Sequence, residues 1–280
     1  MRCDCHVHVV GPIDRYPQAA SRTYLADVAT LDTLRRLGAT RGITRFVIVQ
    51  PSFYGRDNTV LLEALDALGG DGRGVAVVDP SAPQATLDEF ARRGVRGVRL
   101  NVYSAAGRAD AKPITESFAE LAAIAQRMHW HVEIIAALDS LARHANLLAH
   151  SPAPVVIDHF GVYSDATPDS ADARRLLDLL RLPHVWMKLS APYRVSANPL
   201  ETRPDRRWLD AILACAEARC VWGSDWPHTP PHEQQTGPHI VGTYRKLSYE
   251  RLVDDFVAAL GSDTHPDRIL RDNAARLYGF

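Results

Sequence analysis

Residues Arg2-Cys3-Asp4-Cys5-His6-Val7-His8-Val9-Val10 form a stretch that predicts a buried strand ended by Gly11-Pro12. Side chains on a strand alternate between its two faces, so we expect Asp4, His6 and His8 to share one face. The cysteines and valines between them would share the other. In a barrel of parallel strands, the first face would line the pocket where chemistry occurs, and the second would pack against a helix.

Seven more short apolar runs follow, and segments of helical character lie between them. The strands are expected to begin near residues 2, 45, 74, 95, 130, 154, 185 and 220. The helices are expected over residues 31–37, 59–68, 84–93, 115–128, 137–148, 171–180, 205–218, 248–260 and 266–277, with a loop over 11–30. Strict alternation favours parallel strands with crossover helices.

Eight such units in 280 residues predict an α/β fold. The fold expected is a distorted (β/α)8 TIM-type barrel with extra C-terminal helices, as a single domain over residues 1–280. An open doubly wound sheet is the alternative, but no glycine-rich dinucleotide-binding turn follows the first strand.

The composition is that of a globular protein, with 46% hydrophobic residues and a formal net charge of -1. This charge balance gives no electrostatic support for a nucleic-acid or membrane-surface partner. No apolar run approaches the roughly 20 residues that span a bilayer, and no signal sequence opens the chain. The four cysteines, at positions 3, 5, 215 and 220, do not form a disulfide framework, which favours a cytoplasmic location.

Ionisable and polar residues stand where the predicted strands end. In chain order they are His6, His8, Ser52, Asp79, Arg99, Asn101, His131, Glu133, Asp158, His159, Lys188, Ser190, Tyr193, Arg194, Asp225 and His228. Burying a charge without a partner is costly, so packing explains this gathering poorly. The active site of a parallel barrel lies at the carboxyl ends of its strands, and the pattern therefore predicts an enzyme.

Four motifs carry a resemblance that covers nearly the whole chain. They are Asp4-Cys5-His6-Val7-His8, Val98-Arg99-Leu100-Asn101, Ile157-Asp158-His159-Phe160-Gly161 and Trp222-Gly223-Ser224-Asp225-Trp226-Pro227-His228. In this order they resemble the lactonase branch of the amidohydrolase superfamily, which includes 2-pyrone-4,6-dicarboxylate lactonase and sugar-acid lactonases. The resemblance implies a hydrolase that opens a carboxylated lactone in the catabolism of aromatic compounds or sugar acids.

A lactonase needs a proton shuttle, because water must lose a proton and the leaving oxygen must gain one. We assign this role to Asp225. The catalytic histidines His6, His8 and His159 would polarise the carbonyl group. The residues expected to bind the substrate are Arg99, Ser52, Tyr193, Arg194, Asn101 and His228. Asp4 would orient a histidine of its own strand.

The metal content is left open by the sequence. Related binuclear enzymes bridge two metals through a Lys or Glu on the fourth strand and add a His on the fifth. Arg99 and Glu133 stand in those regions here, so a binuclear site is not expected. His6, His8 and Asp225 could hold one divalent ion, with zinc the first choice, or the enzyme could require none.

Several residues have structural alternatives. Arg99 could pair with an interior carboxylate, and Ser52 could be a turn residue. His131 is expected at a helix–strand junction, and Lys188 would be functional only if it points inward.

Other functions also remain as alternatives. A metal-dependent decarboxylase, a lactone isomerase and a binding protein without turnover each fit the same barrel. The expected partner is a small-molecule lactone, and a homo-oligomer is compatible with the sequence.

Overall fold

The computed structural model describes residues 1–104, 112–231, 237–262 and 264–280. Its centre is a sheet of parallel strands in the order β1-β3-β4-β5-β6-β7-β8-β9. The strands are β1 (Arg2–Val7), β3 (Ile43–Val49), β4 (Gly72–Ala76), β5 (Val95–Asn101), β6 (His131–Ile135), β7 (Val155–Ile157), β8 (Val185–Ser190) and β9 (Cys220–Gly223). All eight predicted strands form, and the predicted (β/α)8 barrel is confirmed.

The barrel closes between β9 and β1. Just past β9, Trp226 forms an isolated parallel bridge with Val7. The backbone N–H of Asp225 donates to the carbonyl oxygen of His6 at 2.9 Å, and that of His8 donates to the carbonyl oxygen of Trp226 at 2.8 Å. This closure places Asp225 directly beside the two histidines of the opening strand.

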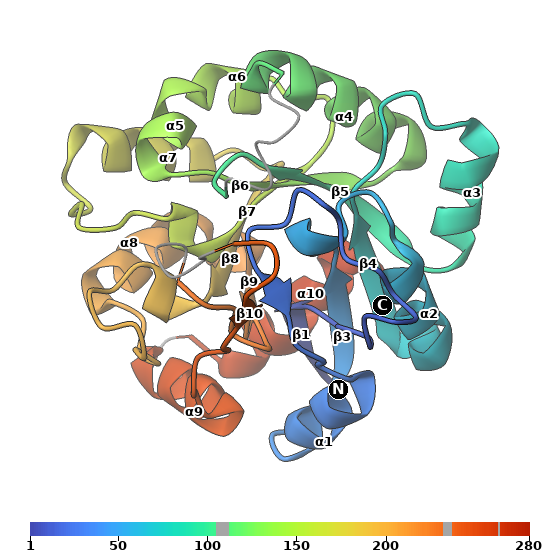
Figure 1. Cartoon of the computed structure of the whole chain (residues 1–280). Helices are drawn as coiled ribbons and strands as arrows, with labels where there is room; N and C mark the ends of the chain where they lie inside the picture. Colours follow the sequence, from blue (N-terminus) through green and yellow to red (C-terminus); the bar gives the residue numbers. More distant parts are fainter. Residues whose placement is uncertain (105–111, 232–236, 263) are drawn as a thin grey trace.

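Helices surround the barrel (Figure 1). They are α1 (Leu31–Ala39), α2 (Thr59–Leu68), α3 (Gln84–Arg92), α4 (Ile114–Met128), α5 (Leu138–Arg143), α6 (Ala145–Ala149), α7 (Ala171–Leu180), α8 (Arg206–Ala216), α9 (Tyr249–Ala259) and α10 (Asn273–Tyr278), with a π-helix over Arg268–Asp272 before α10. The single helix predicted over residues 137–148 is instead two, because the backbone at His144 (φ -102°, ψ 13°) leaves the helical region. Among the described residues, no helix has the length and apolarity needed to cross a membrane.

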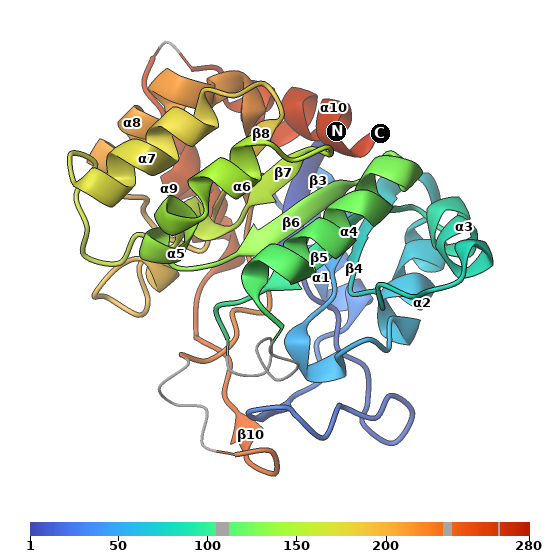
Figure 2. The same ribbon diagram turned by 90° about the horizontal axis from the view of Figure 1, so that it is seen from above.

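The long loop after β1 is not wholly irregular. Its residues Leu25–Ala26 form β2, which pairs in parallel with β10 (Val241–Gly242). Figure 2 shows β10 beyond the end of the barrel that lies opposite the two chain termini. This two-stranded element therefore stands at the carboxyl ends of the barrel strands, where the active site of such a fold is expected.

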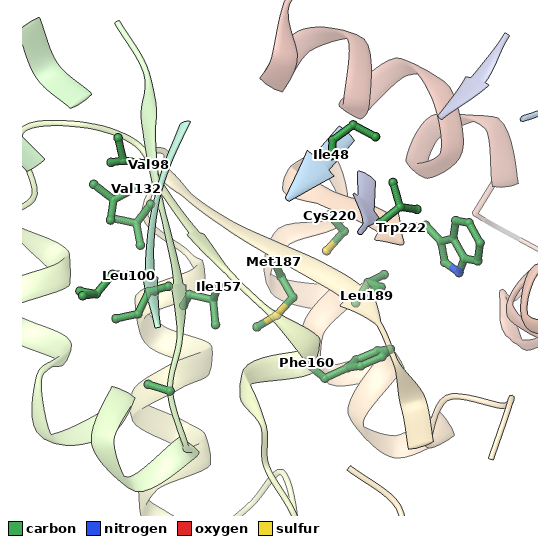
Figure 3. Close-up of a cluster of buried hydrophobic side chains, with 14 of the residues drawn as sticks. Ile48, Val98, Leu100, Val132, Ile157, Phe160, Met187, Leu189, Cys220 and Trp222 are labelled. Atoms are coloured by element: carbon green, nitrogen blue, oxygen red, sulfur yellow. The ribbon is translucent and has the colours of Figure 1, made fainter. Parts of the chain in front are cut away.

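The outward faces of the strands pack against the helices in one large apolar cluster. Figure 3 shows part of it, including Val98, Val132 and Ile157 from β5, β6 and β7. Because side chains alternate along a strand, the neighbours of these residues point into the barrel. Arg99 and Glu133 are such neighbours, and they lie opposite each other in the pairing of β5 with β6.

A register shift in β1 changes the faces that alternation predicts. Asp4 pairs with Phe46 but Val7 pairs with Ile48, so three residues of β1 span two of β3. Before the shift, Asp4 points outward, and its Oδ2 accepts a hydrogen bond of 2.9 Å from the hydroxyl of Tyr249 on α9. The prediction that Asp4 shares a face with the histidines is therefore wrong.

The same shift turns the two cysteines of β1 inward. Cys3 and Cys5 belong to a second apolar cluster, which includes Val47, Val75 and Tyr278. Tyr278 comes from α10, which covers the end of the barrel beside the N-terminus (Figure 2). The interior of the barrel is thus apolar at this end, and the expectation that both cysteines face a surrounding helix, away from the histidines, is wrong.

Candidate active site

The carboxyl ends of the strands surround a small hollow of about 40 Å³. Its lining includes seven residues that the sequence predicts for the site, namely His8, Ser52, Arg99, Asn101, His159, Arg194 and Asp225. These residues come from strands that are far apart in the sequence, and the closed barrel brings them together.

Asp225 is at the centre of this arrangement, and its two carboxylate oxygens differ. Oδ2 accepts a hydrogen bond of 2.7 Å from the hydroxyl of Tyr193 and another of 2.7 Å from Nε of Arg194. The Nη2 group of Arg194 donates in turn to Oγ1 of Thr229 at 2.6 Å. Tyr193 and Arg194, predicted as substrate-binding residues, thus contact Asp225.

The other oxygen of Asp225, Oδ1, has no hydrogen-bond partner although it is buried. It lies 3.6 Å from Nε2 of His6 and 3.4 Å from Nε2 of His8. Burial on its own would raise the pKa of Asp225, but the charge of Arg194 and contacts with the histidines hold it well below its usual value. Asp225 is therefore a carboxylate at neutral pH, with one oxygen free to interact with a reactant.

The histidines are held by groups outside the reacting centre. His8 Nδ1 lies 2.8 Å from the carbonyl oxygen of Val49, which can only accept, so Nδ1 carries the hydrogen of this ring. His159 Nδ1 lies 2.8 Å from Oγ of Ser190. Burial lowers the pKa of His159 to about 4 and holds the pKa of His6 well below its usual value, so both rings are neutral at pH 7.

A buried ionic layer lies beneath these histidines. Lys188 of β8 forms an ion pair with Glu133 of β6, and its Nζ lies 3.6 Å from Oδ1 of Asp158 and 3.2 Å from Nδ1 of His6. All four side chains are inaccessible to solvent or nearly so. Lys188 therefore points inward, the orientation in which the sequence predicts a functional role.

His131 also belongs to this layer, with Nε2 3.8 Å from Oε2 of Glu133. His131 is the first residue of β6 and follows the end of α4 at Met128 by three positions, so it lies at the predicted helix–strand junction, with its ring pointing into the barrel. Gly97 makes room for it, since a Cβ atom there would lie only 2.4 Å from Nε2 of His131. Gly223 makes room for His6 in the same way, since a Cβ atom at Gly223 would lie only 2.6 Å from the Cβ atom of His6.

Three site residues have left-handed backbone conformations, which are uncommon for residues other than glycine. The φ angles are 50° at His159, 59° at Asp225 and 67° at His228. Such conformations cost free energy and persist where the surrounding structure enforces them, often at functional sites. The clustering of three of them here agrees with a functional role for this end of the barrel.

The remaining residues predicted for the site do not all line the hollow at Asp225. Ser52 lines the hollow, and so does Asn101, whose side-chain oxygen also accepts from the backbone N–H groups of Tyr103 and Ser104. His228 packs edge-to-face on Tyr193 and lines a separate cavity of about 330 Å³. Tyr24 and Thr229 also line the hollow, and no sequence motif marks them.

One divalent ion would need donor atoms from His6, His8 and Asp225, and one such atom from each lies within 4.8 Å of the others. His8 and Asp225 fit, because Nε2 of His8 and Oδ1 of Asp225 keep free lone pairs. His6 does not fit. Nζ of Lys188 lies 3.2 Å from Nδ1 of His6, and because an ammonium can only donate, this contact would place the ring hydrogen on Nε2, the atom that faces the site. We therefore derive no catalytic step through a metal.

The buried histidines should make the fold sensitive to acid. Burial lowers the pKa of His159 and of His228 to about 4, whereas both are near 6.5 in an unfolded chain. Between these values the unfolded state binds more protons, so stability falls as the pH falls through this window. Asp4 opposes this in part, because burial raises its pKa to about 6.

We expect the free energy of unfolding to be roughly 3 kcal/mol lower at pH 5 than at pH 7, measured by urea denaturation. Replacing His228 with Gln removes one of these buried histidines and should reduce the difference by about 2 kcal/mol. Equal stability at the two pH values would contradict this prediction.

Comparisons with known proteins show which proteins this chain resembles. A family model described as amidohydrolase matches residues 3–280. The 4-sulfomuconolactone hydrolase of Hydrogenophaga intermedia is 30% identical over 279 residues, which cover 99% of this chain and 88% of that protein. The 2-pyrone-4,6-dicarboxylate hydrolase of Comamonas testosteroni is 32% identical over 271 residues, which cover 90% of this chain and 87% of that protein. A probable 2-pyrone-4,6-dicarboxylic acid hydrolase from Acinetobacter baumannii, whose crystal structure contains bound citric acid, is 25% identical in sequence. Its structure matches with a TM-score of 0.83, and the match covers 100% of this chain and 99% of that chain.

Proposed function

The chain belongs to the amidohydrolase family, and from this premise we propose that it is a hydrolase that opens a carboxylated lactone by attack of water on the ring carbonyl. The relatives named above are hydrolases by name, which makes the decarboxylase and isomerase alternatives less favoured. The observation that carries the proposal is the convergence of the free Oδ1 atom of Asp225 with Nε2 of His6 and of His8 in one buried hollow.

Asp225 acts as the general base. Its Oδ1 atom is free to accept a proton from a water molecule, while Tyr193 and Arg194 hold Oδ2 and so aim the carboxylate. A carboxylate with a low pKa is a weak base in water, so orientation and proximity supply much of its effect. The water oxygen forms a bond to the lactone carbonyl carbon as one of its two protons moves to Oδ1, and the carbonyl oxygen takes up the negative charge.

His6 and His159 stabilise the negative charge that develops on the carbonyl oxygen, whereas Nε2 of His8 is an acceptor and makes no such hydrogen bond. His6 presents an N–H group through Nε2, and His159 lies beside it with ring centroids 4.7 Å apart. Donors fixed before the reaction stabilise an oxyanion without reorganising, which is a large term in acyl transfer. The bond from the carbonyl carbon to the ring oxygen then breaks, and Asp225 returns its proton to that oxygen.

The hollow at Asp225 and a larger cavity beside it differ in volume, and this difference indicates which part of a substrate each one holds. The hollow at Asp225 has room only for the reacting group and a water molecule, since its volume is about 40 Å³. A larger cavity of about 830 Å³ shares Ser52, Arg99 and Asn101 with it. We place the body of the lactone in this larger cavity, which has the size usual for a ligand site.

Arg99 stands at the junction of the two hollows and is the group that we propose to bind the substrate carboxylate. Its Nη1 donates to the carbonyl oxygen of Gln50 at 2.5 Å, and its Nε is buried without a hydrogen-bond partner. Among the described residues, no carboxylate forms an ion pair with Arg99, so its charge is available. A guanidinium binds a carboxylate through two parallel hydrogen bonds.

Replacing Arg99 with Met is expected to raise KM for a carboxylated lactone by about 10- to 100-fold and to change kcat little, because a charged hydrogen bond to the substrate is lost in both ground and transition states. Steady-state kinetics on wild type and variant would measure this. A neutral lactone of the same shape is the control, since its KM should be unaffected. An unchanged KM for the carboxylated lactone would exclude Arg99 as the carboxylate-binding residue.

The proposed function is tested by assaying the purified protein on a panel of carboxylated lactones, with and without a chelator. We expect ring opening of at least one of them, detected by release of a proton and by mass spectrometry of the hydroxy acid. If none of the panel is hydrolysed, the proposal is wrong.

A further inference from the structure

The buried lysine of β8 takes no chemical step in the mechanism above, but it contacts Nδ1 of the catalytic His6. Lys188 is inaccessible to solvent, and so are His6 and Glu133. Its Nζ donates to Oε2 of Glu133 and lies at hydrogen-bonding distance, 3.2 Å, from Nδ1 of His6. As the partner of a carboxylate, Lys188 is an ammonium with three donors and no acceptor.

Two groups compete for Nδ1 of His6, and they would leave the ring in opposite states. A hydrogen bond from Lys188 requires a lone pair on Nδ1 and puts the ring hydrogen on Nε2. A hydrogen bond to Asp158, whose Oδ1 lies 3.3 Å away, requires the hydrogen on Nδ1 and leaves the lone pair on Nε2. The structure favours Lys188, because its contact has hydrogen-bond geometry whereas both oxygens of Asp158 lack a hydrogen-bond partner.

We propose that Lys188 is a positioning residue that holds the ring hydrogen of His6 on Nε2, and thereby makes His6 a hydrogen-bond donor to the reacting oxygen and a poor metal ligand. The proposal rests on the proposed function only for the identity of that oxygen. The tautomer and its effect on metal binding belong to the protein itself and need no substrate.

Replacing Lys188 should therefore allow His6 to act as a metal ligand, which the wild-type tautomer prevents. Without the ammonium, Nδ1 of His6 is free to take the hydrogen and donate to Asp158. Its Nε2 then keeps a lone pair and joins Nε2 of His8 and Oδ1 of Asp225, which already have free lone pairs. Two histidines and a carboxylate are a common ligand set for zinc, with a carboxylate holding the second nitrogen of one histidine.

The test compares zinc affinities of the full-length protein by competition with a chromophoric chelator. Because removing Lys188 leaves Glu133 as an unpaired buried charge, the variant is the double substitution Lys188→Met with Glu133→Gln. We expect it to bind zinc 10- to 100-fold more tightly than wild type. Glu133→Gln alone is the matched control, since it keeps the lysine and should show no gain.

Adding His6→Gln to the double variant should abolish the gained affinity, which would locate the ion at this residue. An affinity within threefold of wild type in the double variant, or an equal gain in Glu133→Gln alone, would overturn the proposal.

A second measurement requires no folded variant at Lys188. The ¹⁵N chemical shifts of histidine ring nitrogens separate a protonated nitrogen from an unprotonated one, and the His6→Gln spectrum identifies the signals of His6. We expect a protonated Nε2 and an unprotonated Nδ1 in wild type at pH 7. The reverse assignment would overturn the proposal. Neither measurement involves a lactone, so failure of the lactonase assay and failure of this inference are distinguishable.

Discussion

Replacing Asp225 with Asn is expected to lower kcat by about 10³- to 10⁴-fold, because the variant lacks the group that accepts a proton from water and returns it to the leaving oxygen. The amide oxygen can still accept from Tyr193 and Arg194, which hold Oδ2 in wild type. The amide NH₂ would then face Nε2 of His8, which is an acceptor. The contacts of Oδ2 are thus preserved while the base is removed.

The measurement is single-turnover and steady-state hydrolysis of the lactone found in the panel. Circular dichroism should show an unchanged fold, with a lower melting temperature because Arg194 loses its charged partner. Asp254→Asn is a suitable control, since that aspartate is on the surface and pairs with Arg41, far from the site in the sequence. Retention of more than a tenth of wild-type activity in Asp225→Asn would remove Asp225 from the mechanism.

Replacing Arg194 with Met has the second largest expected effect, a fall in kcat of about 100-fold with little change in KM. Arg194 donates from Nε to Oδ2 of Asp225 at 2.7 Å and is itself anchored to Thr229. Without it, only the hydroxyl of Tyr193 orients the carboxylate. The pKa of Asp225 should also rise, because the cation that lowers it is gone.

The pH profile distinguishes this role from substrate binding. In wild type the low pKa of Asp225 keeps it ionised through neutral and mildly acidic pH, so its protonation does not limit kcat there. In Arg194→Met the raised pKa should bring an acid limb to the kcat profile, with activity lost as the pH falls. A higher KM with unchanged kcat would instead indicate that Arg194 binds the substrate directly.

Arg194→Met should also destabilise the fold by about 3–5 kcal/mol, because it leaves a buried carboxylate without its cation. Arg194→Lys keeps a positive charge and should recover part of the stability, but less of kcat, since an ammonium cannot reproduce the orientation of the guanidinium. Urea denaturation of the two variants and wild type would measure this difference.

The pattern of the chain was sufficient to predict the barrel. Eight short apolar strands alternate with helices. The spacing of apolar residues along each segment is a local property, because it shows which side chains become buried on folding and whether they recur with the period of a strand or of a helix. The same periodicity identified the strand ends, and a closed barrel brings strand ends to one place. This is why seven of the predicted site residues line one hollow.

Contacts between distant segments could not be predicted in this way. Alternation along β1 assigned Asp4 and the cysteines to the wrong faces, because the register shift depends on pairing with β3. The charge of Arg194 fits a role in binding either a substrate or Asp225, so the residue type alone does not distinguish them. Only the fold shows that Nε of Arg194 contacts Oδ2 of Asp225.

The amino-acid sequence by itself thus determined the architecture, the end of the barrel where chemistry occurs and the residue types present there, since these follow from hydrophobic periodicity and from chain order. The tertiary structure decided which atoms of those residues are free to react. Tyr193 and Arg194 occupy one oxygen of Asp225, and Lys188, 182 positions from His6, holds the nitrogen of that histidine that faces away from the site. Hydrogen bonds act over about 3 Å, and only folding brings residues so distant in the chain to that separation.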